Sequence, residues 1–213
     1  MNNPRPNYAR AVNLACRVLL RLPALYLPVS LEQIVASCPR VRLKTYSQFC
    51  RERGIAMEEF LSWSVSSHGF ALRRGGQAVI LYNEKKEQAT ARFTIAHELG
   101  HLFFLHREDS PLDQLEANCF ARNLLCPPAA ARLLGLETAE EYARAFRVSL
   151  PMARAALACC REDEACLQPA LAKELAGRCA GKKEPPRPAA VVRFVASGED
   201  RRLRQAEARW LEP

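Results

Sequence analysis

Hydrophobic and polar positions repeat along this chain with two periods, and together they predict a series of helices with a few short strands. Apolar residues recur at helical spacing in several segments, and Ser30 and Thr138 stand where two of these segments begin, as helix-capping residues do. The dipeptide Gly75-Gly76 suits the positive φ angles of a tight hairpin between two strand-like runs. The predicted helices cover residues 8–22, 31–38, 48–63, 90–105 and 111–124, a segment that begins after Thr138, and residues 150–161; the predicted strands cover residues 41–46, 69–74 and 77–82.

This order of elements predicts an α+β fold that is mostly helical. The three strands are expected to form a small antiparallel sheet, packed on the helix at residues 90–105. That helix is apolar nearly all round, which is typical of a helix in the middle of a fold.

Two histidines stand four residues apart in this helix, His97 and His101, with Glu98 beside the first. Residues i and i+4 share one helix face, so both imidazoles can bind one zinc ion while Glu98 serves as the general base. The alternative is a pair of ordinary core histidines that are hydrogen-bonded to their neighbours. Gly100 costs about 1 kcal/mol relative to Ala inside a helix, so we expect another backbone or a substrate to pass close by.

A catalytic zinc site needs three protein ligands, so the groups after His101 are the next candidates. Ser110 and Asp113 form a helix start with a proline between them, which explains Asp113 as a capping residue. Glu116 lies deeper in that helix, whose apolar stripe would dock it against the first helix. Glu116 is therefore the predicted third ligand, and an ordinary solvated glutamate is the alternative. His106, five residues beyond His101, would point about 140° around the helix, away from the metal and from His101, so we expect it to cap the helix end or to bind substrate.

Two segments of this region also carry a resemblance to a known family. Residues 92–101 read Arg-Phe-Thr-Ile-Ala-His-Glu-Leu-Gly-His, and residues 116–127 read Glu-Ala-Asn-Cys-Phe-Ala-Arg-Asn-Leu-Leu-Cys-Pro. They resemble the ImmA/IrrE family of metallo-endopeptidases, and the resemblance spans roughly residues 25–160, including the hairpin before the zinc helix. Cys126 departs from the family, which more often carries Met before the proline, and the C-terminal third has no match.

The resemblance implies a zincin-like core that holds one Zn²⁺ per chain. It implies His97, His101 and Glu116 as the metal ligands and Glu98 as the general base. It further implies a bacterial endopeptidase whose protein substrate is a transcriptional repressor of the helix-turn-helix type. The candidates for stabilising the oxyanion are Arg92, His106 and Tyr82.

Composition limits the remaining function classes. With 213 residues that are 49% hydrophobic, the chain can bury one good core plus an appendage. No run approaches the roughly 20 apolar residues of a membrane span, and no export signal is recognisable near the start, so we expect a cytoplasmic protein without a membrane partner. The predicted domains are a metallopeptidase domain at residues 1–165 and a basic, partly flexible appendage at 166–213. That appendage includes a charged, proline-rich linker at residues 182–188 and a lone strand at 191–196.

Nine cysteines without paired spacing agree with a reducing compartment. Four of them follow the predicted enzyme core, namely Cys159, Cys160, Cys166 and Cys179. Their spacing matches no common zinc knuckle, so the sequence leaves open whether they bind a second metal.

The helix pair at residues 138–161 gives a rival interpretation. Its turn at residues 148–149 and the following Arg154 and Arg161 resemble a helix-turn-helix, and a net charge of +8 suits DNA binding. In that alternative the protein is a DNA-binding regulator in which zinc is structural. Two packed helices are common core structure, however, and we favour a basic surface that docks an acidic or DNA-bound protein substrate.

Overall fold

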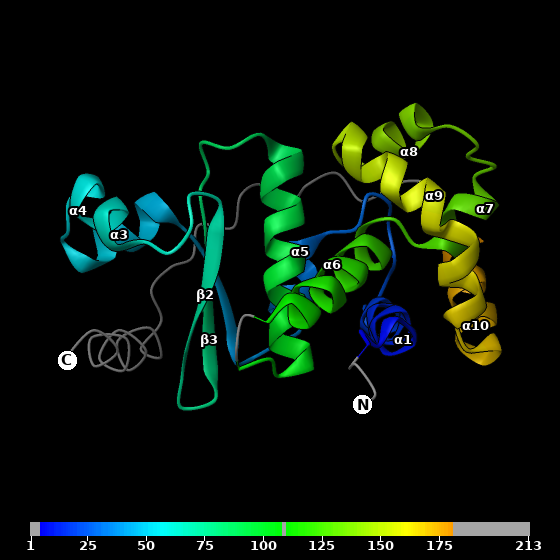
Figure 1. The fold of residues 1–213 in the computed structure, drawn as a ribbon, viewed down its shortest axis with the longest axis horizontal. Helices are drawn as coiled ribbons and strands as arrows, with labels where there is room; N and C mark the ends of the chain where they lie inside the picture. Colours follow the sequence, from blue (N-terminus) through cyan, green and yellow to red (C-terminus); the bar gives the residue numbers. More distant parts are fainter. Residues whose placement is uncertain (1–4, 108–109, 181–213) are drawn as a thin grey trace.

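The computed structural model describes residues 5–107 and 110–180, and Figure 1 shows their arrangement. The predicted α+β class is confirmed: most of the chain is helical, and one small sheet lies beside the long helix α5 (Gln88–Phe104). Helix α6 (Pro111–Leu125) packs along α5, and α1 (Tyr8–Leu20) packs on α6. The linker at residues 182–188 and the strand at 191–196 lie outside the described residues.

The remaining helices and strands surround this centre. The strands are β1 (Val41–Thr45), β2 (Gly69–Arg74) and β3 (Gln77–Tyr82), and the other helices are α2 (Leu31–Ala36), α3 (Tyr46–Arg53), α4 (Met57–Trp63), α7 (Pro128–Leu133), α8 (Ala139–Phe146), α9 (Leu150–Cys166) and α10 (Pro169–Ala180).

The sheet is mixed, so the prediction of an antiparallel sheet was wrong. Its strand order is β1-β3-β2, and β2 pairs with β3 antiparallel across the predicted Gly75-Gly76 turn. β1 pairs with β3 in the parallel direction, with Val41 opposite Ala78 and Thr45 opposite Tyr82. A parallel pair needs a long crossover, and α3, α4 and β2 together supply it.

One predicted helix, at residues 48–63, is two helices. Thr45 opens α3 with a capping box that includes Gln48. Gly54 has a φ of 67°, in the left-handed region, and ends α3, after which α4 begins at Met57. The break turns α4 back against α3, so that both helices cover one face of the sheet.

Alternate residues of β3 point into two different cores, as the two-residue period of a strand requires. Ile80 joins the main core, which α1, α5, α6 and the C-terminal helices share. Val79 and Leu81 join a smaller aromatic cluster under α3 and α4, which contains Tyr46 and Phe60. The sheet is thus covered on both faces, and β2 is left as an edge strand next to α5.

The C-terminal helices extend the main core. The helix pair expected at residues 138–161 is present as α8 and α9, and Thr138 is the predicted cap of α8, where it forms a capping box with Glu141. The expected domain boundary at residue 165 falls in the last turn of α9, and α10 beyond it packs on α1 and α7 with Leu175 buried. In the described part of the chain, none of the helices is long and apolar enough to cross a membrane.

Candidate metal centre

Helix α5 carries the two histidines of the motif and is held close to α6 at Gly100. A Cβ atom placed on Gly100 would lie 3.1 Å from the Ala117 Cα atom and 3.1 Å from a ring carbon of Phe120. The neighbouring backbone expected at Gly100 is therefore that of α6. This close approach brings polar side chains of α6 within hydrogen-bonding distance of the histidines on α5.

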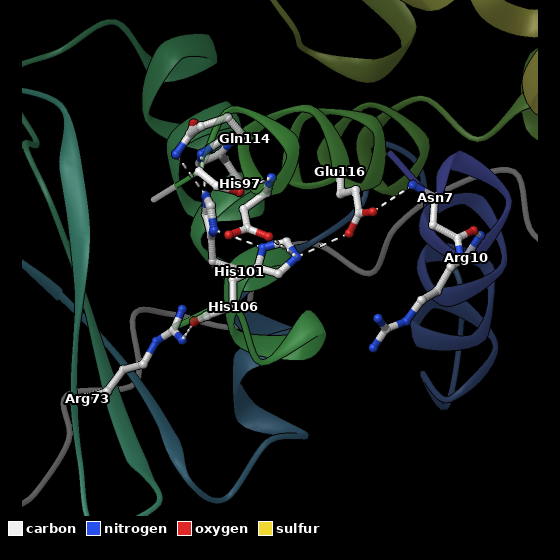
Figure 2. Close-up of polar contacts among 10 residues, drawn as sticks. Asn7, Arg10, Arg73, His97, His101, His106, Gln114 and Glu116 are labelled. Atoms are coloured by element: carbon white, nitrogen blue, oxygen red, sulfur yellow. Dashed lines mark hydrogen bonds and ion pairs between the residues drawn. The ribbon is translucent and has the colours of Figure 1, made fainter. Parts of the chain in front are cut away.

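His97 and His101 turn their Nε2 atoms toward each other, 3.0 Å apart (Figure 2). The Oδ1 atom of Asn118 lies 2.9 Å from His97 Nδ1 and can only accept, so His97 donates from Nδ1 and has its lone pair on Nε2. The Nε2 atom of Gln114 lies 3.3 Å from His101 Nε2 and can only donate, so His101 also has its lone pair on Nε2. Both partners on α6 therefore favour tautomers whose lone pairs converge.

A zinc ion between the two nitrogens would bind both lone pairs, replacing the Gln114 amide at His101 Nε2, and this donor set fits zinc. Zn–N bonds of about 2.0–2.1 Å in a tetrahedral site place two ligand nitrogens about 3.3 Å apart, close to the separation seen here. Asn118 has the position of an outer hydrogen-bond partner that orients a metal-binding imidazole. The residues present fit a zinc ion at His97 and His101.

His106 lies in the site, so the expectation that it points away from His101 was wrong. α5 ends at Phe104, and Leu105 has a φ of 61°, which turns the chain back. The His106 N–H then donates to the His101 carbonyl at 3.1 Å, and the two Nδ1 atoms of these residues lie 3.1 Å apart. The 100° step per residue cannot be extrapolated past the end of a helix.

Glu116 contacts His106 and the start of the chain. Its Oε1 atom accepts a hydrogen bond of 2.6 Å from the Asn7 N–H, and its Oε2 atom lies 3.2 Å from His106 Nε2. The Ser110 side chain caps the helix by accepting from the Asp113 N–H, as predicted. The Asp113 carboxylate, which was expected to complete that cap, instead has its Oδ1 atom 3.3 Å from the same His106 nitrogen. Ligand atoms of His106, Asp113 and Glu116 lie within 4.8 Å of one another. Among the described residues it is therefore this trio, and not His97, His101 and Glu116, that forms a close group able to hold a metal ion.

A cavity of about 640 Å³ opens beside the histidines. Glu98, His101 and His106 line one side of it, and residues 70–73 of the edge strand β2 line another. Arg73 reaches across from β2, and its guanidinium donates to the His106 carbonyl oxygen. Burial lowers the pKa of Arg73, and the negative charge of Glu98 opposes that shift, so the two charges share one environment. The cavity thus places a carboxylate, an imidazole and a cation around space for a ligand.

Glu98 also influences the neighbouring aromatic cluster. Burial raises the pKa of Tyr46 to about 12, with smaller contributions from the charges of Glu98 and Glu84. The Tyr46 hydroxyl donates to the Ser66 carbonyl at 2.7 Å, so its protonated form is the one that the fold uses.

The three oxyanion candidates lie in different places. His106 lines the cavity. Arg92 donates to the Phe146 carbonyl between α5 and α8, and Tyr82 ends β3 next to β1, and neither is among the described residues that line the cavity. Arg73 lines it, and the sequence reasoning did not consider it. The sequence did offer a signal for Arg73: it is a basic residue on the first strand of the hairpin that comes directly before the helix with the two histidines.

Gln114 and Asn118 were also missed. They stand four residues apart on α6, on the face that also presents Ala117 to α5. The sequence offered one signal for them: two amide side chains four residues apart share a helix face, and the small residue Ala117 beside them allows a close helix contact.

In the part of the chain that the structure describes, the sulfur atoms of the four C-terminal cysteines are not gathered closely enough to hold a metal ion. The group whose ligand atoms all lie within 4.8 Å of one another there is His106, Asp113 and Glu116. All nine cysteines are free thiols. Cys160 instead accepts a contact of 3.6 Å from the Tyr142 hydroxyl, which ties α8 to α9.

A small mixed sheet beside a histidine-bearing helix, with a carboxylate facing a cavity, is the arrangement expected of a metallopeptidase. A family model described as Peptidase_M78, IrrE N-terminal-like domain, matches residues 50–158, more than half of the 213-residue chain. The chain belongs to this family, the ImmA/IrrE metallopeptidases, as its motif residues suggested. Among curated proteins, no match to the chain is found.

Proposed function

We propose that this protein is a zinc-dependent endopeptidase that hydrolyses a peptide bond in a protein partner. His97, His101 and Glu116 hold one Zn²⁺ per chain in this proposal, and Glu98 is the general base. The observation that carries it is the pair of Nε2 atoms 3.0 Å apart, each with its lone pair set by a partner on α6. A carboxylate has about four lone-pair sites, so the two hydrogen bonds of Glu116 leave it able to bind a metal as well.

The roles of the side chains follow from their positions. When bound, zinc supplies a Lewis acid that polarises the peptide carbonyl and lowers the pKa of water toward about 7. Glu98 lines the cavity beside His101, where its carboxylate can take a proton from the attacking water and return it to the leaving amine. Arg73, on the same cavity, is positioned to donate to the developing oxyanion.

The proposed substrate is a transcriptional repressor of the helix-turn-helix type, as the family resemblance implies. A net charge of +8 suits attraction to an acidic or DNA-bound protein. We place the reaction in the cytoplasm, because nine free thiols agree with a reducing compartment.

Metal analysis and one substitution test this proposal. Purified protein should contain one zinc per chain, and metal-free protein without affinity for zinc would refute the proposal. The variant Glu98→Gln should keep the metal and lose cleavage of a repressor that is co-expressed from the adjacent gene. Cleavage that persists in Glu98→Gln would show that Glu98 is not the base.

The DNA-binding alternative has its own test. Arg154 and Arg161 are exposed on α9, where a duplex could reach them. Retention on duplex DNA at about 150 mM salt that is lost in Arg154→Ala would favour this alternative. Binding that disappears with salt and does not depend on Arg154 would reflect net charge alone.

A further inference from the structure

His106 lies between two of the proposed metal ligands and contacts both. Its Nδ1 atom is 3.1 Å from His101 Nδ1, and its Nε2 atom is 3.2 Å from Glu116 Oε2 and 3.3 Å from Asp113 Oδ1 (Figure 2). Its side chain is only 8% exposed, so these protein atoms are its main partners.

The direction of each hydrogen bond follows from the partners at the two ends of this chain of groups. The His101 Nε2 lone pair accepts from Gln114 here, and a zinc ion would take that lone pair in place of the amide. Either partner puts the proton of a neutral His101 on Nδ1, so His101 donates to His106 Nδ1. His106 then carries its own proton on Nε2, where two carboxylates accept it. Glu116 and Asp113 can only accept, which requires the proton of His106 on Nε2, and a donor or metal at His101 Nε2 requires the proton of His101 on Nδ1. The two requirements are compatible with each other.

We propose that His106 is a positioning residue of the metal centre, which accepts the Nδ1 proton of His101 and donates its Nε2 proton to Glu116. It thereby fixes the tautomer in which the lone pair of His101 Nε2 is available to the metal. It also holds the Glu116 carboxylate on the side of α6 that faces His106. This role rests on the proposed metallopeptidase function. Outer hydrogen bonds of this kind keep metal-binding imidazoles in orientation and raise their basicity.

The ring of His106 is held in place for this role. It stacks on Phe104 with ring centres 4.9 Å apart and an angle of 19° between the planes. Its carbonyl oxygen accepts from Arg73, and its backbone N–H donates to His101. The turn at Leu105 creates all of these contacts together.

The same proton order argues against a second metal ion at His106, Asp113 and Glu116. A metal ligand there would need a lone pair on His106 Nε2, and His106 Nδ1 already uses its lone pair to accept from His101. Binding a metal at both places would require an anionic imidazole. The short separations within the trio are therefore the hydrogen bonds of a protonated Nε2, and one metal ion per chain is expected.

Nitrogen NMR of the zinc-loaded protein tests the proton order without a substitution. The chain has four histidines, and His68 is exposed and serves as the reference. His97 and His101 should show the proton on Nδ1, and His106 should show it on Nε2. A proton on His106 Nδ1 would overturn the proposal.

Zinc affinity, measured by competition with a chromophoric chelator, tests the consequence. His106→Phe can keep the stacking on Phe104 and removes the hydrogen bonds of both ring nitrogens, so zinc should bind about 10–100-fold more weakly. The visible spectrum of the cobalt-substituted protein should change as well. His106→Asn, whose amide oxygen can replace Nδ1 as the acceptor from His101, should recover part of the affinity, and His68→Gln should leave it unchanged.

The outcomes separate this proposal from the one on which it rests. Wild-type protein that binds no zinc refutes the metallopeptidase function and the positioning role together. If the wild type binds zinc and folded His106→Phe binds it equally tightly, with an unchanged cobalt spectrum, the positioning role alone is refuted. Two zinc ions in the wild type and one in His106→Phe would make His106 a ligand of a second ion and would also overturn it.

Discussion

Asp163 on α9 is buried against α6, and its removal should destabilise the protein strongly. Its two carboxylate oxygens accept hydrogen bonds of 2.8 Å each from the Nε and Nη2 atoms of Arg122, and a third of 2.9 Å from Asn123 Nδ2. The Asp163 side chain is 7% exposed, and that of Arg122 is 19% exposed. Burial alone would lower the pKa of Arg122, but hydrogen bonding to Asp163 raises it above its ordinary value. The pair is therefore a strongly coupled, mostly buried ion pair.

The substitution Asp163→Ala leaves the Arg122 charge and the Asn123 amide without this partner. Breaking a buried ion pair by removing one member costs about 3–5 kcal/mol. Water can reach the partly exposed Arg122, so we expect the lower end, about 3 kcal/mol. For a chain of this size, that corresponds to a fall in Tm of about 6–12 °C.

The neighbouring residue provides a matched control. Glu164 pairs with Arg132, whose side chain is 73% exposed, and such surface pairs contribute about 0–1 kcal/mol. Urea unfolding of Asp163→Ala and Glu164→Ala, followed by circular dichroism, should give losses in the free energy of unfolding that differ by at least about 2 kcal/mol. Equal, small losses would refute the reasoning that α9 is held on α6 by this buried pair.

Three further predictions concern packing, the metal site and pH. Gly100→Ala should lower the free energy of unfolding by about 1–3 kcal/mol, because the added methyl group meets the α6 backbone at 3.1 Å. The control Gly177→Ala, which has open space around it, should be neutral or stabilising. Equal effects of the two substitutions on the free energy of unfolding would contradict the close helix contact. Asn118→Leu should weaken zinc binding about 10–100-fold by chelator competition, because His97 loses the acceptor that fixes its tautomer, and an unchanged affinity would exclude that role. Burial raises the pKa of Cys16 to about 11 and of Cys119 to about 12 from the ordinary 9.0, so their stabilising effect is complete below pH 9 and is lost as pH rises through these values. The urea midpoint in the presence of reductant should fall between pH 8 and pH 10.5, and a constant midpoint would contradict this.

Local signals predicted most of the elements correctly. Ser30 caps α2, Thr138 opens α8, and Gly75-Gly76 forms the hairpin turn, because caps and tight turns depend on residues within three or four positions of one another. The parallel pairing of β1 with β3 could not be predicted from local signals, because it joins strands that lie more than 30 residues apart in the sequence. Gly54 shows an intermediate case: it is visible as a possible helix end, but the helical pattern on both sides of it favoured one long helix.

The sequence by itself determined that His97 and His101 share a helix face with Glu98 beside them, because that spacing is a property of the α-helix. Only the tertiary structure decided which groups surround them. The close packing at Gly100 brings Gln114 and Asn118 of α6 onto the imidazoles, and the left-handed turn at Leu105 returns the next histidine to the site. Hydrogen bonds across two helices depend on their distance and rotation, which the packing of the whole core sets and which no local pattern records.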